Sequence, residues 1–345
     1  MEEQKLSEER LREYQTFLEQ KHEYRRSVKR LCSVLGFSLL ALFLGIQLIG
    51  ILLYLLSSFL SSHKMMGMGA ELFRVLNSDW FSMAGQSLLA YAIMLPIVEK
   101  ILRRVPETKM EPRRMRKGKL FSFAVLVMGG GYIFNLAGSL INIVLAQLTG
   151  RPAENLMPIN DVLQHMNWAV AVYVGIIAPI IEEYIFRGLI LNRLRPLGEK
   201  AAVIFPAVMF GLMHGNLSQT MYATAIGIVF GYIAVKTGRI FYNTVLHILV
   251  NSYTIFIVVG VMKNSVVHGE VYNSKMMLIS LFTIGCIIGA VIIFVQRVKK
   301  TRLKPGSWPE GLEYSDFSSA MFLNPGTMLF GAVCVGLIIF FAFFA

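Results

Sequence analysis

Long apolar runs recur along nearly the whole chain, and they constrain its fold more than any other feature. They cover residues 32–60, 82–98, 120–148, 168–190, 201–215, 217–235, 240–262, 276–296 and 327–345. A helix of about 20 residues crosses the roughly 30 Å hydrocarbon layer of a bilayer. Because lipid offers no partners to backbone N–H and C=O groups, such runs form helices. The sequence therefore predicts an all-α, polytopic transmembrane helical bundle of about eight to nine spans.

The positions of the basic residues predict the orientation of these spans. Lys and Arg collect in cytoplasmic connections, and here they are dense in the second, fourth, sixth and eighth connections. These connections centre on residues 100–119, 193–200, 236–239 and 297–304. The pattern predicts a cytoplasmic N-terminus. It also puts Trp80 and Trp168 at outer membrane boundaries and Trp308 near an inner one, where indoles prefer to lie.

The formal net charge of +12 has the same explanation. Cytoplasmic loops and anionic lipid headgroups account for the excess of bases. We therefore expect membrane lipids as partners and no nucleic acid. No cleavable signal is evident, and the basic loops suit a bacterial plasma membrane. Cys32, Cys286 and Cys334 fall singly in apolar runs and predict neither a disulfide framework nor a cysteine metal site.

The apolar and charged segments divide the chain into four parts. Residues 1–31 alternate acids and bases and predict a charged cytoplasmic N-terminal helix supported by pairs three and four residues apart. Residues 32–164 contain N-terminal transmembrane helices, in which Gly129-Gly130-Gly131 favours close helix packing. The segment 165–262 is the predicted catalytic core. Residues 263–345 add C-terminal transmembrane helices and a cytoplasmic loop.

A few ionisable side chains lie inside the predicted spans. The carboxylates are Glu182 and Glu183, the histidines are His214 and His247, and Arg187 follows the carboxylates on the same span. A charged side chain near the bilayer centre costs roughly 2.5–3.5 kcal/mol or more, so such groups are expected to be functional.

Helical spacing sorts these groups into faces. Glu183 and Arg187 are four residues apart and can pair, whereas Glu182 is rotated by about 100° toward a different cavity. His214 shares a face with Phe210, whose ring can shape the floor of a pocket. His247 likewise shares a face with Asn251. Counted at 1.5 Å per residue from the cytoplasmic ends, these groups converge in one layer.

Two kinds of hydrolytic chemistry fit this set. Glu182, His214 and His247 form a recognised zinc-ligand combination with one position left open for water. Without a metal, Glu182 and His214 can activate the water while His247 and Asn251 hold the oxyanion. The H-E-x-x-H motif of ordinary zinc peptidases is absent. The sequence leaves both mechanisms open.

The ordered trio Glu-Glu-x-x-x-Arg, Phe-x-x-x-His and His-x-x-x-Asn resembles the CAAX protease and bacteriocin-processing (CPBP, or Abi) family of intramembrane proteases. The resemblance covers roughly residues 168–255. It implies that Glu182 is the water-activating base, that His214 assists it or binds metal, and that His247 and Asn251 bind metal or the oxyanion. Glu183 and Arg187 would make structural or substrate-positioning contacts.

Other functions remain open at this stage. A single membrane histidine often serves only as a hydrogen-bonding residue between helices. A family member without catalysis would be a bacteriocin self-immunity or scaffold protein, and intramembrane Glu and His also occur in proton-coupled transporters. For a protease, the resemblance implies a peptide or lipidated-protein substrate: prenylated CAAX tails in eukaryotic members, peptide processing in bacterial ones.

Overall fold

The computed structural model describes residues 2–63, 66–150, 166–262 and 274–343, whose regular structure is helical throughout. The prediction of an all-α bundle is confirmed. The N-terminal elements are α1 (Glu2–Ser62), α2 (Met68–Leu76), the π-helix η1 (Phe81–Gly85), α3 (Gln86–Leu102) and α4 (Lys117–Thr149). The central elements are α6 (Trp168–Val172), η3 (Tyr173–Ile177), α7 (Ala178–Glu183), η4 (Tyr184–Ile190), α8 (Leu191–Leu194), η5 (Arg195–Leu197), α9 (Glu199–Leu212), α10 (Leu217–Thr237), α11 (Phe241–Ser252) and η6 (Tyr253–Val259). The C-terminal elements are α13 (Ser274–Val298), α14 (Tyr314–Phe322) and α15 (Pro325–Phe343).

Eight helical stretches among the described residues are long and apolar enough to cross a membrane. They are Glu8–Ser62, Phe81–Leu102, Lys117–Thr149, Trp168–Leu197, Leu217–Thr237, Phe241–Met262, Ser274–Val298 and Pro325–Phe343. The outer faces of these helices carry large apolar side chains, as on α13, where only Cys286 and Ala290 are buried. The chain is a multi-pass membrane protein.

The apolar run 201–215 forms a shorter helix, α9, of 14 residues. At 1.5 Å per residue it is about 21 Å long, less than the bilayer core. Gly215 ends the segment with φ +66°, a left-handed conformation that a side chain would strain. α9 packs lengthwise on α10 as a hairpin, and most of its residues are buried.

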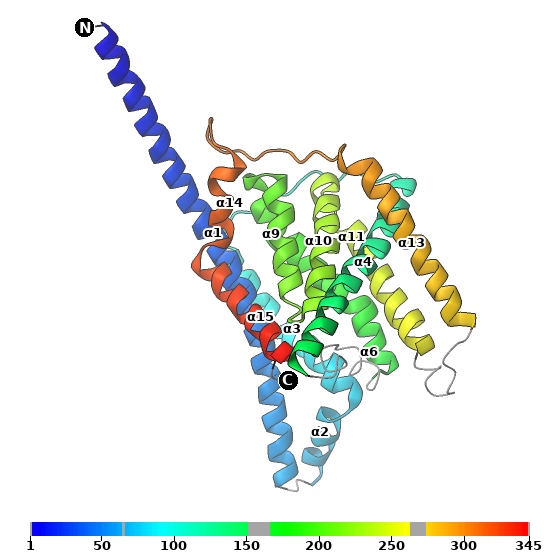
Figure 1. Ribbon diagram of the computed structural model, residues 1–345. Coiled ribbons are helices and arrows are strands. Elements are labelled where there is room, and N and C mark those ends of the chain that lie inside the picture. The colour runs from blue at the N-terminus through cyan, green and yellow to red at the C-terminus, as the bar shows by residue number, and fades with distance from the viewer. Residues whose placement is uncertain (1, 64–65, 151–165, 263–273, 344–345) are drawn as a thin grey trace.

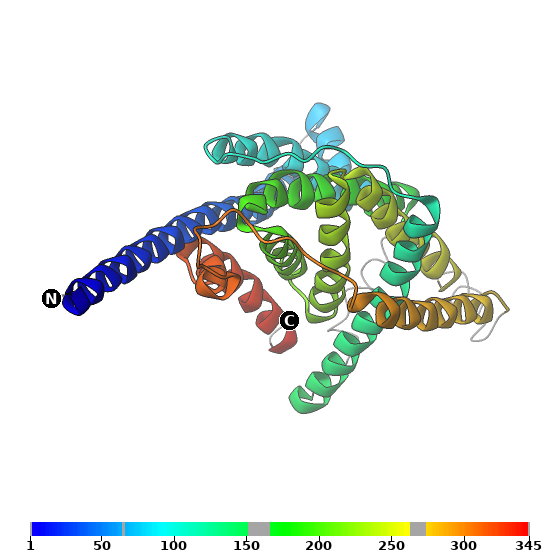
Figure 2. The same ribbon diagram turned by 90° about the horizontal axis from the view of Figure 1, so that it is seen from above.

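The four basic connections lie at one end of the bundle, as their hydrogen bonds show. In the connection before α4, Thr108 N donates to Asn192 O at 3.0 Å, and Arg113 N donates to Thr237 O at 2.7 Å. The connection after α13 crosses the same end (Figure 2), where Lys304 O accepts from Glu199 N at 3.0 Å. This arrangement agrees with the predicted clustering of bases on one side of the membrane.

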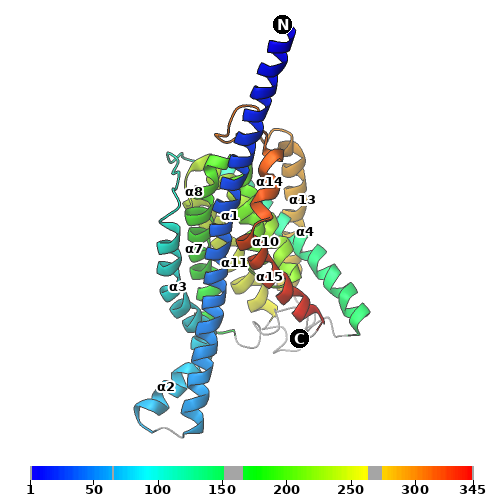
Figure 3. The ribbon, with the colours of Figure 1, turned by 90° about the vertical axis from the view of Figure 1, so that its left-hand side faces the viewer.

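The N-terminal segment and the first span are one continuous helix. α1 runs without a break from Glu2 to Ser62 and extends beyond the bundle at the basic end (Figures 1 and 3). The short helix α14 packs against it, with Lys21 Nζ 2.6 Å from Asp316 Oδ1 and the rings of Tyr24 and Phe317 5.1 Å apart. The Lys21 ammonium, with the Glu313 N–H, holds the pKa of Asp316 below its usual range.

Glycines allow two helix pairs to touch along their backbones. Where α1 crosses α15, a Cβ on Gly326 would lie 1.9 Å from the Ser33 carbonyl oxygen. Where α4 crosses α13, a Cβ on Gly129 would lie 2.1 Å from the Cys286 carbonyl oxygen. The predicted role of Gly129 in close helix packing is therefore correct.

We predict that Gly326→Val destabilises the bundle by about 1–3 kcal/mol or more, because the added methyl groups meet backbone that cannot move aside. Gly331→Val on the same helix is the matched control, since nothing lies within 4 Å of its Cβ position. Unfolding in SDS titrated against a non-ionic detergent measures both variants. Equal stability of the two would contradict the crossing described for α1 and α15.

Candidate active site

The fourth span alternates between α- and π-helical turns. The π-helices η3 and η4 flank α7, which carries Glu182 and Glu183. A π-turn breaks the regular i→i+4 ladder and leaves carbonyl groups for other donors. Here Asn251 Nδ2 donates to Val174 O at 3.0 Å, and Ser252 Oγ donates to Gly175 O at 3.1 Å. The end of α11 is thereby fixed to the π-turn of η3.

Glu183 and Arg187 form the predicted pair across one helical turn. Arg187 Nη1 lies 2.9 Å from Glu183 Oε1, and both side chains are 0% exposed. Nη2 donates to Gly227 O on α10 at 3.1 Å. A Cβ on Gly227 would lie 3.3 Å from that nitrogen, so the missing side chain permits the close approach.

Two phenyl rings surround this ion pair. The Arg187 guanidinium carbon lies 5.0 Å from the ring centroid of Phe210 on α9 and 5.3 Å from that of Phe230 on α10. Such contacts favour a desolvated cation. The same rings contact His247, with centroids 5.7 Å and 5.3 Å from its imidazole. α9 and α10 thus build an aromatic wall around the charges.

His247 of α11 lies between the two glutamates. Its Nδ1 is 3.1 Å from Glu183 Oε1, and its Nε2 is 3.5 Å from Glu182 Oε2. Glu183 Oε1 therefore contacts both Arg187 and His247. Because a carboxylate only accepts, this contact puts a proton on Nδ1 and directs Nε2 toward Glu182.

Glu182 differs from its neighbours in accessibility. Its side chain is 16% exposed, against 3% for His247 and 0% for Glu183. Glu182 is thus the carboxylate of the pair that keeps some access to solvent, while Glu183 is enclosed in the helix packing.

His214 stands at the turn after α9. Its Nδ1 lies 2.8 Å from Phe210 O, and a carbonyl oxygen only accepts, so Nδ1 carries a proton. The other ring nitrogen, Nε2, then bears a lone pair in the neutral imidazole. The predicted packing of Phe210 beside His214 is present, with the ring centroids 5.0 Å apart.

The structure therefore joins only some of the predicted site residues directly. Glu182, Glu183, Arg187 and His247 form one contact chain, and Phe210 lies beside both histidines. Asn251 instead donates to the η3 backbone. Within the described ranges, no hydrogen bond or ion pair joins His214 to Glu182.

These donors do not fit the zinc combination as they are placed. In the part of the chain that the structure describes, no group of three His, Cys, Asp or Glu side chains is arranged to hold a metal ion. His247 directs both ring nitrogens at carboxylates. We therefore derive no step through a metal.

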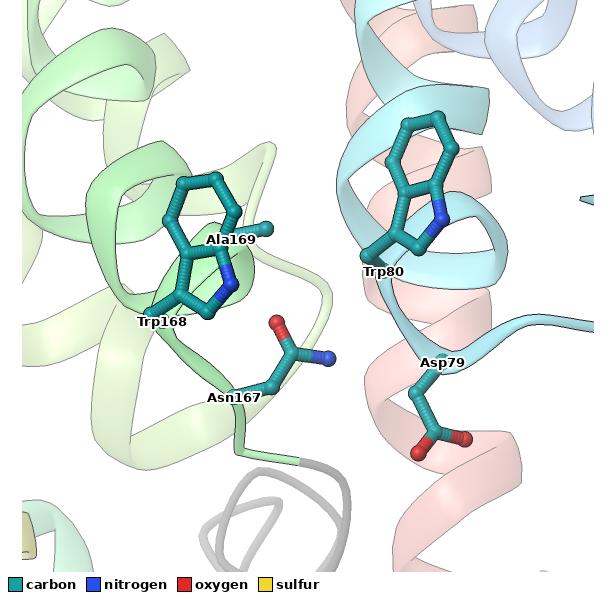
Figure 4. Close-up of a pocket in the computed structure, with 5 residues that line it drawn as sticks. All are labelled: Asp79, Trp80, Asn167, Trp168 and Ala169. Atoms are coloured by element: carbon teal, nitrogen blue, oxygen red, sulfur yellow. The ribbon is translucent and has the colours of Figure 1, made fainter.

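A cavity of about 560 Å³ opens at the other end of the same helices. Asp79, Trp80, Asn167, Trp168 and Ala169 line it, at the starts of η1 and α6 (Figure 4). Both tryptophans lie at the end away from the basic connections, where the sequence places an outer membrane boundary. Ala169 precedes Glu182 by thirteen residues, roughly 20 Å of helix, so this cavity is separate from the charge cluster.

Several residues of the site carried no signal in the sequence. Phe230 and Gly227 are ordinary apolar and small residues of a span, and only the fold brings them to Arg187. Tyr222 follows His214 by eight residues across a turn, so no helical spacing relates the two.

Comparison with known proteins points to the same segment. The family described as "Type II CAAX prenyl endopeptidase Rce1-like" matches residues 164–253. The "Putative membrane peptidase YdiL" of Bacillus subtilis (strain 168) is 28% identical over 201 residues, covering 56% of this chain and 78% of the relative. No solved structure matches this chain at a significant level.

The helical membrane bundle and these similarities define a membrane peptidase of the CAAX-protease-like class. Both similarities support the CPBP family.

We predict that Arg187→Ala destabilises the protein by about 3–5 kcal/mol, because it leaves Glu183 charged, buried and without its partner. Arg74→Ala is the control. It removes the partner of Glu71 from an exposed ion pair whose nitrogen and oxygen lie 2.7 Å apart. An exposed ion pair contributes about 1 kcal/mol or less to stability. The same detergent titration measures both. A small, equal effect of the two substitutions would contradict the buried pair.

Proposed function

We propose that this protein is an intramembrane endopeptidase in which Glu182 is the general base that activates water. The observation that carries the proposal is the asymmetry of the two adjacent carboxylates. Glu183 is fully buried and contacts Arg187 and His247, whereas Glu182 remains 16% exposed opposite His247 Nε2. A carboxylate that is mostly buried but still reached by solvent suits proton abstraction from water.

Charge balance supports this division of roles. The Arg187 cation neutralises Glu183, so the second carboxylate needs a partner of its own. His247 can supply it by carrying a proton on Nε2 while Glu182 is ionised. When Glu182 takes a proton from water, its carboxyl group becomes neutral. Glu183 keeps the His247 ring oriented through Nδ1 during this step. Glu183 and Arg187 are therefore positioning residues in this proposal.

His214 and Asn251 take separate roles. The Nε2 lone pair of His214 can accept a proton from water or hydrogen-bond the attacking oxygen. The amide of Asn251 holds the η3 turn through Val174 O, which sets the course of the helix that carries Glu182. Asn251 is thus also a positioning residue in this proposal.

The substrate we propose is a membrane-associated peptide or the C-terminal tail of a lipidated protein. The matching family is described as a CAAX prenyl endopeptidase. A site on transmembrane helices suits a substrate that is itself anchored in or bound to the membrane. We place the protein in a bacterial plasma membrane, in line with the relative from Bacillus subtilis and the basic connections at one end of the bundle.

We predict that Glu182→Gln and His214→Ala each abolish cleavage, with a loss of at least about 10²-fold, while the protein stays folded in detergent. Purified enzyme is added to membranes from cells that produce the Glu182→Gln variant, which retain uncleaved substrate. Mass spectrometry then follows the new peptide termini. Wild-type rates from either folded variant would sink the assignment.

The placement of the donors also predicts the response to metal removal. Because His247 engages both glutamates and His214 lies apart from them, we expect full activity in a strong chelator and no stoichiometric zinc by elemental analysis. Loss of activity that zinc restores would show instead that Glu182, His214 and His247 rearrange around an ion. The chelator is tested on purified protein in the same membrane assay.

A further inference from the structure

One face of α1 carries four basic side chains that the proposed active site does not use. They line a cavity of about 360 Å³ and are His22, Arg25, Arg26 and Lys29. Spacings of three, four and seven residues put them on one side of the helix, and all four are exposed. The nearby Lys21 pairs with Asp316, whereas within the described ranges no ion pair engages any of the four. Their positive charge is therefore not neutralised by a carboxylate of the described residues.

This cavity lies at the depth of lipid headgroups. Lys29 precedes the apolar run 32–60 by three residues. The four bases cover about 10 Å of helix, and the headgroup layer of each leaflet is roughly 5–7 Å thick. Aromatic rings mark the same level, because the ring centroid of Phe317 lies 5.1 Å from those of both Tyr24 and Trp308. Amphipathic aromatic side chains prefer the membrane interface, so the bases face phosphate groups there.

Arg25 is held in place by a second helix. Its Nη2 donates to Ser319 Oγ of α14 at 3.1 Å, and α1 and α14 lie side by side (Figures 1 and 3). α14 is itself fixed to the bundle, since the rings of Phe322 and of Phe205 on α9 have centroids 5.6 Å apart. A guanidinium that a neighbouring helix already orients loses less entropy when it binds a ligand. The bases therefore belong to a built site and not to a free charged arm.

Exposed apolar side chains continue from the bases into the first span. Phe37 follows Arg26 by eleven residues, and Leu44 follows Phe37 by seven, which keeps all three on one side of the helix within about 20°. Phe37 is 44% exposed and Leu44 is 46% exposed. A ligand with an anionic head and an apolar chain therefore meets complementary groups along one side of α1. A free anion would use the bases alone.

We propose that this face of α1, together with α14, binds the phosphate group of an anionic phospholipid. The guanidinium groups of Arg25 and Arg26 donate to the phosphate oxygens in the forked geometry that suits them. The acyl chains pass along Phe37 and Leu44. Clusters of bases directly beside a span are typical of such headgroup recognition. The site is separate from the charge cluster around Glu182, and this proposal does not depend on the proposed function.

The test measures how phosphatidylglycerol stabilises the purified protein in dodecyl maltoside. Thermal unfolding is followed against lipid concentration, and native mass spectrometry counts the lipid molecules retained. The variant carries Arg25→Gln and Arg26→Gln. The control carries Arg113→Gln and Arg114→Gln, which are also adjacent, exposed arginines at the basic end of the bundle. Each base near an anionic headgroup strengthens binding about fivefold, so we expect the half-saturating concentration to rise about 30-fold in the variant. We expect the control to stay within about threefold of wild type.

Ser319→Ala separates a built site from diffuse attraction, because it changes no charge. It releases Arg25 from α14, so we expect the half-saturating concentration to rise about fivefold. Lys29→Gln, with an expected rise of about fivefold, keeps the proposal testable if the double variant does not fold. Glu182→Gln is expected to bind the lipid like wild type. Size-exclusion chromatography confirms folding of every variant.

Three results would overturn the proposal. If both double variants lose affinity equally, the basic end as a whole attracts the lipid and α1 holds no site of its own. If phosphatidylcholine with the same acyl chains stabilises the protein as well as phosphatidylglycerol, the anionic headgroup is not recognised. If inorganic phosphate at matched ionic strength stabilises it as well, the ligand is not a lipid. None of these results bears on the proposed function, which the cleavage assay of Glu182→Gln tests separately.

Discussion

The buried contact of Glu183 with Arg187 and His247 is the interaction on which the site depends. An isolated charge in such packing is strongly unfavourable, and an ion pair is tolerated there only with good geometry and further hydrogen bonds. Arg187 meets both conditions through Gly227 O and two phenyl rings. Five helical segments, α7, η4, α9, α10 and α11, therefore meet at the cluster of Glu183, Arg187 and His247. Moving any of these segments would break a contact that stabilises the buried charges.

That same contact distinguishes Glu183 from the glutamate proposed for chemistry. Two adjacent carboxylates in a low-dielectric region repel each other unless a cation lies nearby. Here Arg187 pairs with Glu183, and Glu182 faces His247 Nε2 at 3.5 Å. The imidazole is the single group that contacts both carboxylates among the described residues, so it links the structural half of the cluster to the exposed half.

Sequence reasoning was reliable where one helical turn decides the geometry. The spacing of four residues correctly paired Glu183 with Arg187 and Phe210 with His214. It did not reveal that His247 touches both glutamates, because distances between helices depend on tilt and packing. The spacing of His247 and Asn251 also gave no sign that Asn251 donates to η3. The π-turn of η3 offers a carbonyl that an α-helical ladder would have used, and Asn251 donates to it.

The apolar run 201–215 is already short in the sequence, and the shortness of α9 explains the position of His214. α9 begins at the end where the basic connections lie, and its roughly 21 Å fall short of the opposite boundary of a 30 Å apolar layer. The turn that follows would leave backbone groups unsatisfied at that depth. Asn216 answers this need by donating to His214 O at 3.2 Å and accepting from Gln219 N. A polar turn inside the bundle thus holds the His214 imidazole at this depth, whereas a longer helix would have carried it to the far surface.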